Sequence, residues 1–259
     1  MRLLKPFFVF AGLATCLAIS PLMASPVACP GASPGPAATL ADYIPAFSSP
    51  VPIEANQCSI SGLAFKEFFF LNLTPGGAQP GHLTEADFGM VPDGSAIGFD
   101  ISLPGKLYSN EYYYLSYRVD PAPILGGEEL SFDFSFSDFG LGRFGIQTAP
   151  TAIVSKWACP QGDLTTIPNV NNPIGQGSVA CNSLLPGQPT FLQVLPGESD
   201  SATFPQLVAV TEVGILFYLN GELPDMTVGT GSQVVPEPSS IALMGAGIAG
   251  LLALRRRKK

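Results

Sequence analysis

Apolar and polar residues alternate with a period of two along much of the chain, which is typical of β-strands with one buried face. In residues 131–138, the phenylalanines fall on one face and the serines and aspartates on the other. Residues 113–119 alternate in the same way, with Ser116 and Arg118 on the outer face. Both segments are therefore predicted to be half-buried strands.

Two further apolar segments are expected to form strands. In residues 63–73, the pattern predicts one side made of Leu63, Phe65, Phe69 and Leu71. In residues 207–219, alternate apolar residues share one parity, which predicts a single long strand near the end of the body.

Turn signals rich in glycine and proline separate these segments, among them Pro104-Gly105, Pro196-Gly197 and Asn220-Gly221. The body contains no convincing amphipathic helix. Many short strands separated by such turns indicate an all-β fold, an antiparallel β-sandwich or jelly-roll-like ectodomain.

Composition agrees with one packed domain. The chain has 259 residues, of which 46% are hydrophobic and only 12% are charged. The net charge is −8, and most of the cations lie at the two ends, so the body between them is strongly acidic. Such a body repels phosphate backbones, which excludes nucleic acid as a partner. The sequence has a single histidine, so no site can use two imidazoles.

Residues 1–28 are predicted to be a secretory signal peptide that forms a helix. A basic start precedes a short apolar run, and small residues follow it. The run is shorter than the roughly 20 residues of a spanning helix, which favours a signal peptide over the alternative of an N-terminal anchor. Cleavage is expected between Ala24 and Ala28. The secreted β-sandwich domain is then expected to occupy residues 29–233.

Residues 234–259 combine three elements in order. The first is Val235-Pro236-Glu237-Pro238, whose prolines predict an extended and accessible backbone. The second is an apolar stretch, which predicts a hydrophobic helix that anchors residues 239–254 in the membrane. The third is a basic stop that stays on the cytoplasmic side: Arg255, Arg256, Arg257, Lys258 and Lys259. This order predicts a sorting tail that a membrane enzyme removes, and the alternative is an anchor that is never cut.

The Pro236-Glu237-Pro238 motif, the apolar span and the basic end resemble the PEP-CTERM sorting signal of Gram-negative bacteria. The resemblance implies an exosortase as partner, an integral membrane enzyme with a transpeptidase-like cysteine that removes the tail. It also implies a host that secretes exopolysaccharide and forms biofilms or flocs. The chain is therefore expected to cross the inner membrane and to reach the cell surface or the medium.

Four cysteines lie in the body: Cys29, Cys58, Cys159 and Cys181. An even number in an exported chain predicts two disulfides, with three possible pairings. Proximity in the sequence favours Cys29–Cys58 and Cys159–Cys181. The alternative, a metal site, lacks any Cys-x-x-Cys spacing, and no metal or cofactor is expected.

The body also resembles a group of secreted PEP-CTERM proteins in which a cysteine precedes a strand of the type Cys-x-Ile-x-x-Leu-x-Phe-x-x-Phe. Residues 58–68 carry this pattern, and the strand at residues 112–119 is similar. The resemblance to this group implies no activity.

Candidate catalytic residues are few. Residues 140–145 fit the Gly-x-Gly-x-x-Gly pattern, but strand-like sequence follows them where a dinucleotide site needs a helix. His82 could act with Glu85 or Asp87, although a lone histidine in a loop is more often solvated. Glu128, Glu129, Asp133 and Asp138 could supply a carboxylate pair for glycoside hydrolysis, but their placement at a turn and on alternating strand positions favours a solvated edge. The acidic loops at Asp93 and Asp200 could bind calcium, but they lack an Asp-x-Asp-x-Asp ladder. We therefore expect that the protein is not an enzyme.

Tyr112 and Tyr114 are candidate ligand-facing aromatics. Tyrosines at residues 112–114 and phenylalanines at residues 68–70 place rings on both faces of their strands. Rings on a sandwich surface can stack on sugars, whereas burial of both faces under loops would explain the same rings.

The sequence predicts a non-enzymatic surface or extracellular protein, sorted by exosortase and belonging to the biofilm or exopolysaccharide matrix. The alternative is a carbohydrate-binding module for the host exopolysaccharide, and a third hypothesis is a hydrolase that uses unpaired acids. The expected partners are the exosortase, the inner membrane before processing, and exopolysaccharide.

Overall fold

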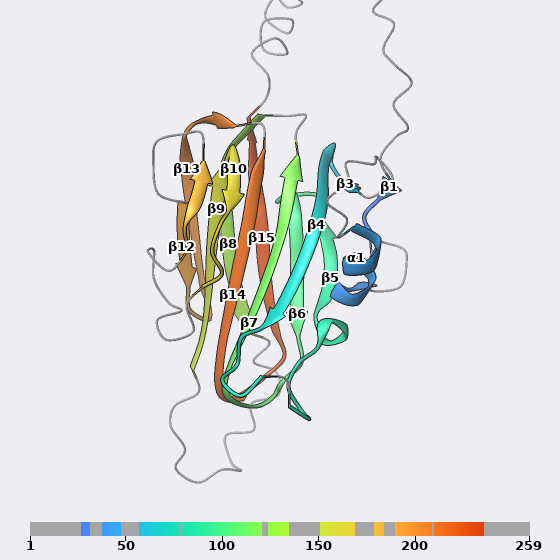
Figure 1. Cartoon of the computed structure of the whole chain (residues 1–259), viewed down its shortest axis with the longest axis vertical. Coiled ribbons are helices and arrows are strands. Elements are labelled where there is room, and N and C mark those ends of the chain that lie inside the picture. Colours follow the sequence, from blue (N-terminus) through green and yellow to red (C-terminus); the bar gives the residue numbers. More distant parts are fainter. Residues whose placement is uncertain are drawn as a thin grey trace, which may run out of the picture.

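The computed structural model (Figure 1) describes residues 27–31, 38–47, 57–77, 79–120, 124–134, 151–168, 179–183, 190–208 and 210–235. Within these residues most regular structure is β-strand, and two large sheets enclose a hydrophobic core between them. The predicted all-β fold class is confirmed, with a sheet-on-sheet arrangement. The signal and sorting helices fall outside the described residues, apart from Val27 and Ala28, which form a short strand.

The front sheet in Figure 1, called sheet A, has seven strands. All neighbours in it are antiparallel except the first pair, which is parallel. In spatial order its strands are β1 (Val27–Ala28), β3 (Cys58–Ile60), β4 (Leu63–Asn72), β7 (Lys106–Asp120), β14 (Thr211–Leu223), β9 (Thr151–Pro160) and β12 (Thr190–Val194).

The rear sheet, called sheet B, has six strands, and all of its neighbours are antiparallel. In spatial order they are β13 (Glu198–Val208), β8 (Ile124–Phe134), β15 (Met226–Val235), β6 (Gly98–Leu103), β5 (Gly89–Asp93) and β2 (Ala38–Thr39). A separate pair, β10 (Gly162–Leu164) and β11 (Cys181–Ser183), lies beside β9 and β14.

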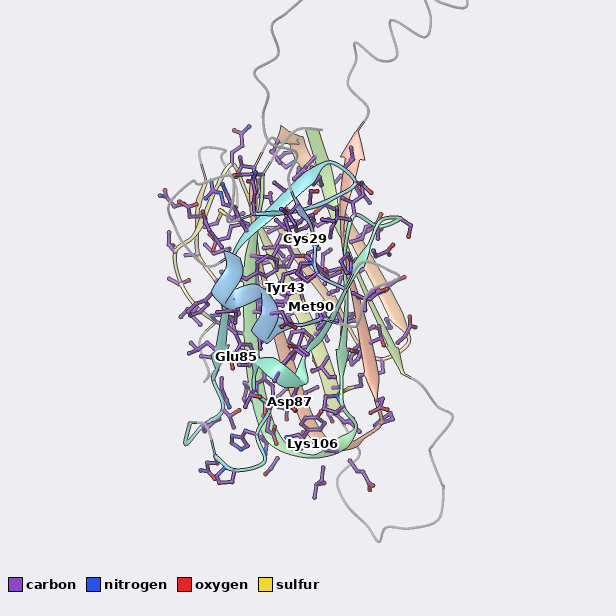
Figure 2. All side chains as sticks on the ribbon, turned by 90° about the vertical axis from the view of Figure 1, so that its right-hand side faces the viewer. Cys29, Tyr43, Glu85, Asp87, Met90 and Lys106 are labelled. Atoms are coloured by element: carbon purple, nitrogen blue, oxygen red, sulfur yellow. A yellow bond between two sulfur atoms is a disulfide. The ribbon has the colours of Figure 1, made fainter. Side chains whose placement is uncertain are left out.

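One edge of the sandwich is covered by α1 (Leu40–Phe47), with the short 3₁₀ helix η2 (Glu85–Asp87) next to it (Figure 2). Thr39 precedes α1, and its backbone N–H donates to the Asp42 carboxylate at 2.8 Å, which satisfies a donor at the start of the helix. Leu40 and Tyr43 are fully buried on its inner side. The expectation of no helix in the body is therefore wrong, because two inward residues are too few to mark a helical period.

Aromatic rings from both sheets meet in the core. Phe99 of sheet B lies with its ring centroid 5.0 Å from that of Phe65 and 5.7 Å from that of Tyr117, both of sheet A. On β7 the predicted inward face is confirmed, since its residues are buried: Tyr113, Leu115, Tyr117 and Val119. The strand is not half-buried along its whole length, because Ser116 on the opposite face is buried as well. The period-two pattern thus identifies the residues that join the sheets.

An ion pair crosses this core. Lys156 of β9 and Glu128 of β8 are both fully buried, and Lys156 Nζ lies 2.7 Å from Glu128 Oε2. Lys156 Nζ also donates to the backbone oxygens of Glu129 at 2.9 Å and Gly231 at 3.0 Å. The predicted solvated edge is therefore wrong for Glu128, which has the parity of the inward Leu130 on the same strand. Glu129 and Asp133 are exposed.

A β-bulge changes the predicted face of β4. The pairing of β4 with β7 shifts between Lys66 and Phe69, and Glu67 adopts a left-handed φ of 56°. An extra residue reverses the alternation beyond it. Phe68 is therefore buried while Phe69 is 44% exposed, so the predicted side that joined Phe69 to Leu63 and Phe65 is wrong.

The long strand predicted for residues 207–219 is two strands. β13 ends at Val208 in sheet B, and β14 begins at Thr211 in sheet A. In the sequence, apolar residues with odd numbers happen to continue on both sides of this connection. Periodicity alone therefore cannot show where one strand ends and the next begins. Conversely, Asn220-Gly221 is no chain reversal but a bulge inside β14, where Gly221 has a φ of 86°.

Both disulfides favoured by proximity are confirmed. Cys29–Cys58 spans 29 residues and links the segment after β1 to β3, while Cys159–Cys181 spans 22 residues and links β9 to β11. The second bond fixes the β10–β11 pair against the outer face of sheet A.

Candidate functional site

A hollow of about 430 Å³ lies on the outer face of sheet B. In the register of the sheet, Gly229 lies between Asp100 and Ser131. A Cβ atom at Gly229 would come within 2.5 Å of Ser131 Oγ, so the glycine keeps the centre of the hollow open. Acidic and hydroxyl side chains surround it: Asp93, Asp100, Glu129, Ser131, Ser199 and Ser201.

The hollow has a negative electrostatic character. Burial raises the pKa of Asp100, and the neighbouring Asp93 and Asp133 raise it further. Asp93 differs, because hydrogen bonds from the Ser95 side chain and backbone lower its pKa. Carboxylates and hydroxyls of this kind accept hydrogen bonds from neutral or cationic ligands and disfavour anions. Within the described ranges, no group of three or more His, Cys, Asp or Glu side chains could hold a metal ion.

The outer face of sheet A carries aromatic side chains instead. Tyr112 of β7 lies directly across from Tyr218 of β14, with ring centroids 4.9 Å apart and ring planes inclined by 31°. Both tyrosines are half-buried. Burial raises the pKa of the Tyr112 hydroxyl, and Tyr218 adds to this effect, so the hydroxyl stays protonated. Tyr112 therefore lies half-buried on the outer face of sheet A, and its contact with a ligand stays a prediction.

The prediction that Tyr114 faces a ligand is wrong. It is only 3% exposed and packs in a small cluster with Trp157, Val179 and Leu216 on the same outer face. The β10–β11 pair, held by Cys159–Cys181, covers this part of the face. A ring in this position stabilises the cover and is closed to a sugar.

Polar contacts fasten the cover to sheet A. Arg118 Nη1 donates to Asp163 Oδ1 at 2.6 Å, and the backbone N–H of Leu164 donates to Glu212 Oε2 at 2.6 Å. Burial raises the pKa of the Glu212 carboxyl to about 6; the bond from Leu164 and the charge of Arg118 oppose this rise, and Asp163 and Glu67 add to it. An ionised Glu212 is therefore costly in the folded protein.

This cost predicts a pH-dependent contribution to stability. The pKa of Glu212 is higher in the folded chain, about 6, than its ordinary value of 4.5, so this group's stabilisation is present below about pH 4.5 and is lost as the pH rises through about 6. Glu212→Gln keeps an acceptor for Leu164 and removes the charge. We expect the Tm difference, variant minus wild type, to be about 2–4 °C larger at about pH 7.5 than at about pH 4.5, since solvent screening limits the effect to about 1 kcal/mol. Thermal unfolding by circular dichroism at both pH values measures it, and an equal difference at both would contradict the assignment.

Other candidates from the sequence do not come together. His82 Nδ1 lies 3.1 Å from the backbone oxygen of Gly77 in its own loop. Asp87 instead accepts hydrogen bonds from the backbone N–H of Thr84 at 2.7 Å and from its hydroxyl at 2.9 Å, which caps η2. Residues 140–145 and Asp138 lie outside the described residues.

Sequence reasoning missed Tyr218. Its parity, opposite to that of the buried Ile215 and Phe217, places it on the outer face of β14. Its position beside Tyr112 depends on the register between β7 and β14, and these strands lie about a hundred residues apart in the chain. The sequence therefore indicates on which face of β14 Tyr218 lies, but it does not indicate that Tyr112 is its neighbour.

The predicted sorting motif begins at the end of the last strand among the described residues. β15 pairs with β8 up to Val235, and Pro236 follows immediately. Residues 234–258 match the family model of the PEP-CTERM protein-sorting motif. The chain carries a PEP-CTERM sorting motif. A PEP-CTERM motif implies an exported protein that is anchored transiently in the membrane, is processed by an exosortase and is then located at the surface or outside the cell.

Most of the PEP-CTERM motif, including Pro236, Glu237, Pro238 and the basic stop at residues 255–259, lies outside the described residues. In the part of the chain that the structure describes, no helix has the length and apolar character to cross a membrane. A search of curated proteins finds no match to the PEP-CTERM chain.

Two solved structures show a distant likeness to the PEP-CTERM chain. TmCBM61 in complex with beta-1,4-galactotriose has 8% identity and a TM-score of 0.27, covering 64% of this chain and 88% of that one. The enzymatically active domain of the bacteriophage CBA120 tailspike protein 4 has 10% identity and a TM-score of 0.27, covering 65% of this chain and 19% of that one. TM-scores of this size support no inference about fold or function.

Proposed function

We propose that this chain is a non-enzymatic component of the biofilm or exopolysaccharide matrix, delivered by export and exosortase processing. The observation that carries the proposal is the PEP-CTERM motif at residues 234–258, which begins at the end of β15, the last strand among the described residues of a disulfide-bonded domain. Disulfides persist in proteins outside the cytoplasm, which agrees with export. The acidic body also favours solubility in a hydrated matrix.

The intact mass of the native protein, recovered from the medium and the cell surface, tests the proposal. We expect a mass that lacks the signal peptide and ends near Pro236. Glu237→Ala, in the motif, is expected to leave an unprocessed chain in the membrane fraction. Glu222→Ala removes an exposed carboxylate of β14 outside the motif and should be processed normally.

Two results would contradict the proposal. A wild-type chain that still ends at Lys259 in the membrane fraction of a host with exosortase would mean that the tail is a permanent anchor. Hydrolysis of neutral polysaccharides by the processed protein would overturn the non-enzymatic part of the proposal.

A second candidate function is binding of the host exopolysaccharide. The observation that favours it is the Tyr112–Tyr218 pair, because two adjacent half-exposed rings on a sheet face offer a surface on which sugars can stack.

A further inference from the structure

The outer face of sheet A is covered unevenly. Tyr114 and Trp157 are buried beneath the segment that carries Leu164 and Val179. Tyr112 and Tyr218, one row further along the same face, remain half-exposed. The tilted Tyr112–Tyr218 pair therefore continues, on the same face, an aromatic cluster whose other part is closed. Tyrosine gives rigid contact area at a low entropic cost, which suits a binding surface.

Two asparagines border the pair. Asn110 lies at the bulge between β7 and β14 and adopts a left-handed φ of 52°. A bulge redirects side chains relative to a regular strand. Asn110 Oδ1 accepts a hydrogen bond from the Tyr218 hydroxyl at 2.9 Å, and Asn220 Oδ1 accepts one from the Asn110 backbone N–H at 3.3 Å. Both amide oxygens accept a bond from the protein, so the two NH₂ groups are the donors that these asparagines can offer to a ligand.

The charge of this surface selects among ligands. The two tyrosines and two asparagines are uncharged, while Glu222, two residues beyond Asn220, is exposed. The chain as a whole carries a net charge of −8. An anionic polymer would be repelled by this surface, whereas an uncharged one would not. The acidic hollow of sheet B differs in kind, because none of its lining residues is aromatic.

We propose that Tyr112, Tyr218, Asn110 and Asn220 form a binding surface for an uncharged polysaccharide. The apolar faces of its sugar rings pack on the tyrosines, and its hydroxyl oxygens accept hydrogen bonds from the two amides. The inference rests on the proposed function, because it assigns the contact between a matrix protein and its polymer to a specific site.

Native gel electrophoresis of the processed protein, in gels that contain hydroxyethylcellulose, dextran or galactan, tests the site. We expect retardation in at least one of these neutral polymers and none in alginate, which is anionic. Tyr112→Ala and Tyr218→Ala are each expected to weaken the binding about tenfold, as loss of a central aromatic contact does. Asn220→Asp replaces the amide donor by an acceptor and should weaken binding while keeping the bond from Asn110.

Phe69→Ala is the matched control, because Phe69 is an exposed ring on the same face of sheet A but outside the site. It should bind as wild type does, and circular dichroism confirms that each variant is folded. The inference is overturned if no neutral gel retards the wild type, or if folded tyrosine variants bind equally well. A processed protein that fails to bind would contradict this site alone, whereas an unprocessed chain in the membrane would contradict the proposed function.

Discussion

Lys156→Met is expected to lower the free energy of unfolding by about 3–5 kcal/mol, because it leaves a fully buried carboxylate without its partner. Lys156 Nζ lies 2.7 Å from Glu128 Oε2 and satisfies two backbone oxygens as well. Among the described residues, the Glu128 carboxylate would then keep one hydrogen-bond partner, the hydroxyl of Ser232, which lies 3.1 Å from both of its oxygens. Urea unfolding of the processed protein measures the loss.

Two comparisons isolate this effect. Lys66→Met breaks a partly exposed ion pair with Asp120 and should cost about 1 kcal/mol or less. The double replacement Lys156→Met with Glu128→Leu removes both buried charges and should recover much of the loss. Burial raises the pKa of the Glu128 carboxyl, so Lys156→Met should also be less destabilising in acid, where the carboxyl takes up a proton. Equal costs at Lys156 and Lys66 would contradict the role of the pair.

Phe99→Ala is expected to cost about 3–5 kcal/mol, the usual range for removing a large buried ring. Phe99 is fully buried. Its ring is surrounded by four others, with centroids at 5.0 Å from Phe65, 5.5 Å from Tyr43, and 5.7 Å from both Phe68 and Tyr117. Because Phe99 belongs to sheet B while the four rings come from sheet A and from α1, the cavity would open where these three parts meet. Thermal and urea unfolding measure the loss.

Phe69→Ala is the control for this substitution. The side chain removed is the same, but Phe69 is 44% exposed. Its loss should cost about 1 kcal/mol or less. A cost comparable to that of Phe99→Ala would mean that the outer face of sheet A is covered more completely than the structure shows.

Much of the fold follows from alternation in the sequence, and the exceptions have local causes. The inner residues of β7 were predictable because no irregularity interrupts residues 113–119. The face of Phe69 was not, because the bulge at Glu67 depends on pairing with β7. α1 was missed because Leu40 and Tyr43 are its only fully buried residues among those whose side chains are described.

Charged residues in the core show a different limit. Glu128 and Lys156 both have the parity of buried neighbours, Leu130 and Val154, so the pattern alone would place them inside. Charge argued against burial, because a lone buried ion is very costly. Only the packing of β9 against β8 shows that each supplies the partner of the other.

Some features of the candidate site could be predicted from the sequence, and others could not. Tyr112 was predictable as an outward ring, and the disulfide pairing followed from proximity in the sequence. The burial of Tyr114 depends on the cover fixed by Cys159–Cys181, and the neighbour of Tyr112 depends on strand register. Tertiary contacts, which leave no local pattern, decide both.

The place of β15 sets an order of events for the precursor. It follows every other described strand in the sequence, yet it lies between β8 and β6, where Met226 pairs with Leu103 on one side and Phe134 on the other. Before β15 pairs with β8 and β6, the strands on its two sides in sheet B are not joined to each other. Contacts between residues so far apart in the sequence form slowly. We therefore expect the polypeptide to cross the membrane unfolded. The arrest of its basic end would then give β15 time to join the sheet before the scissile region is released.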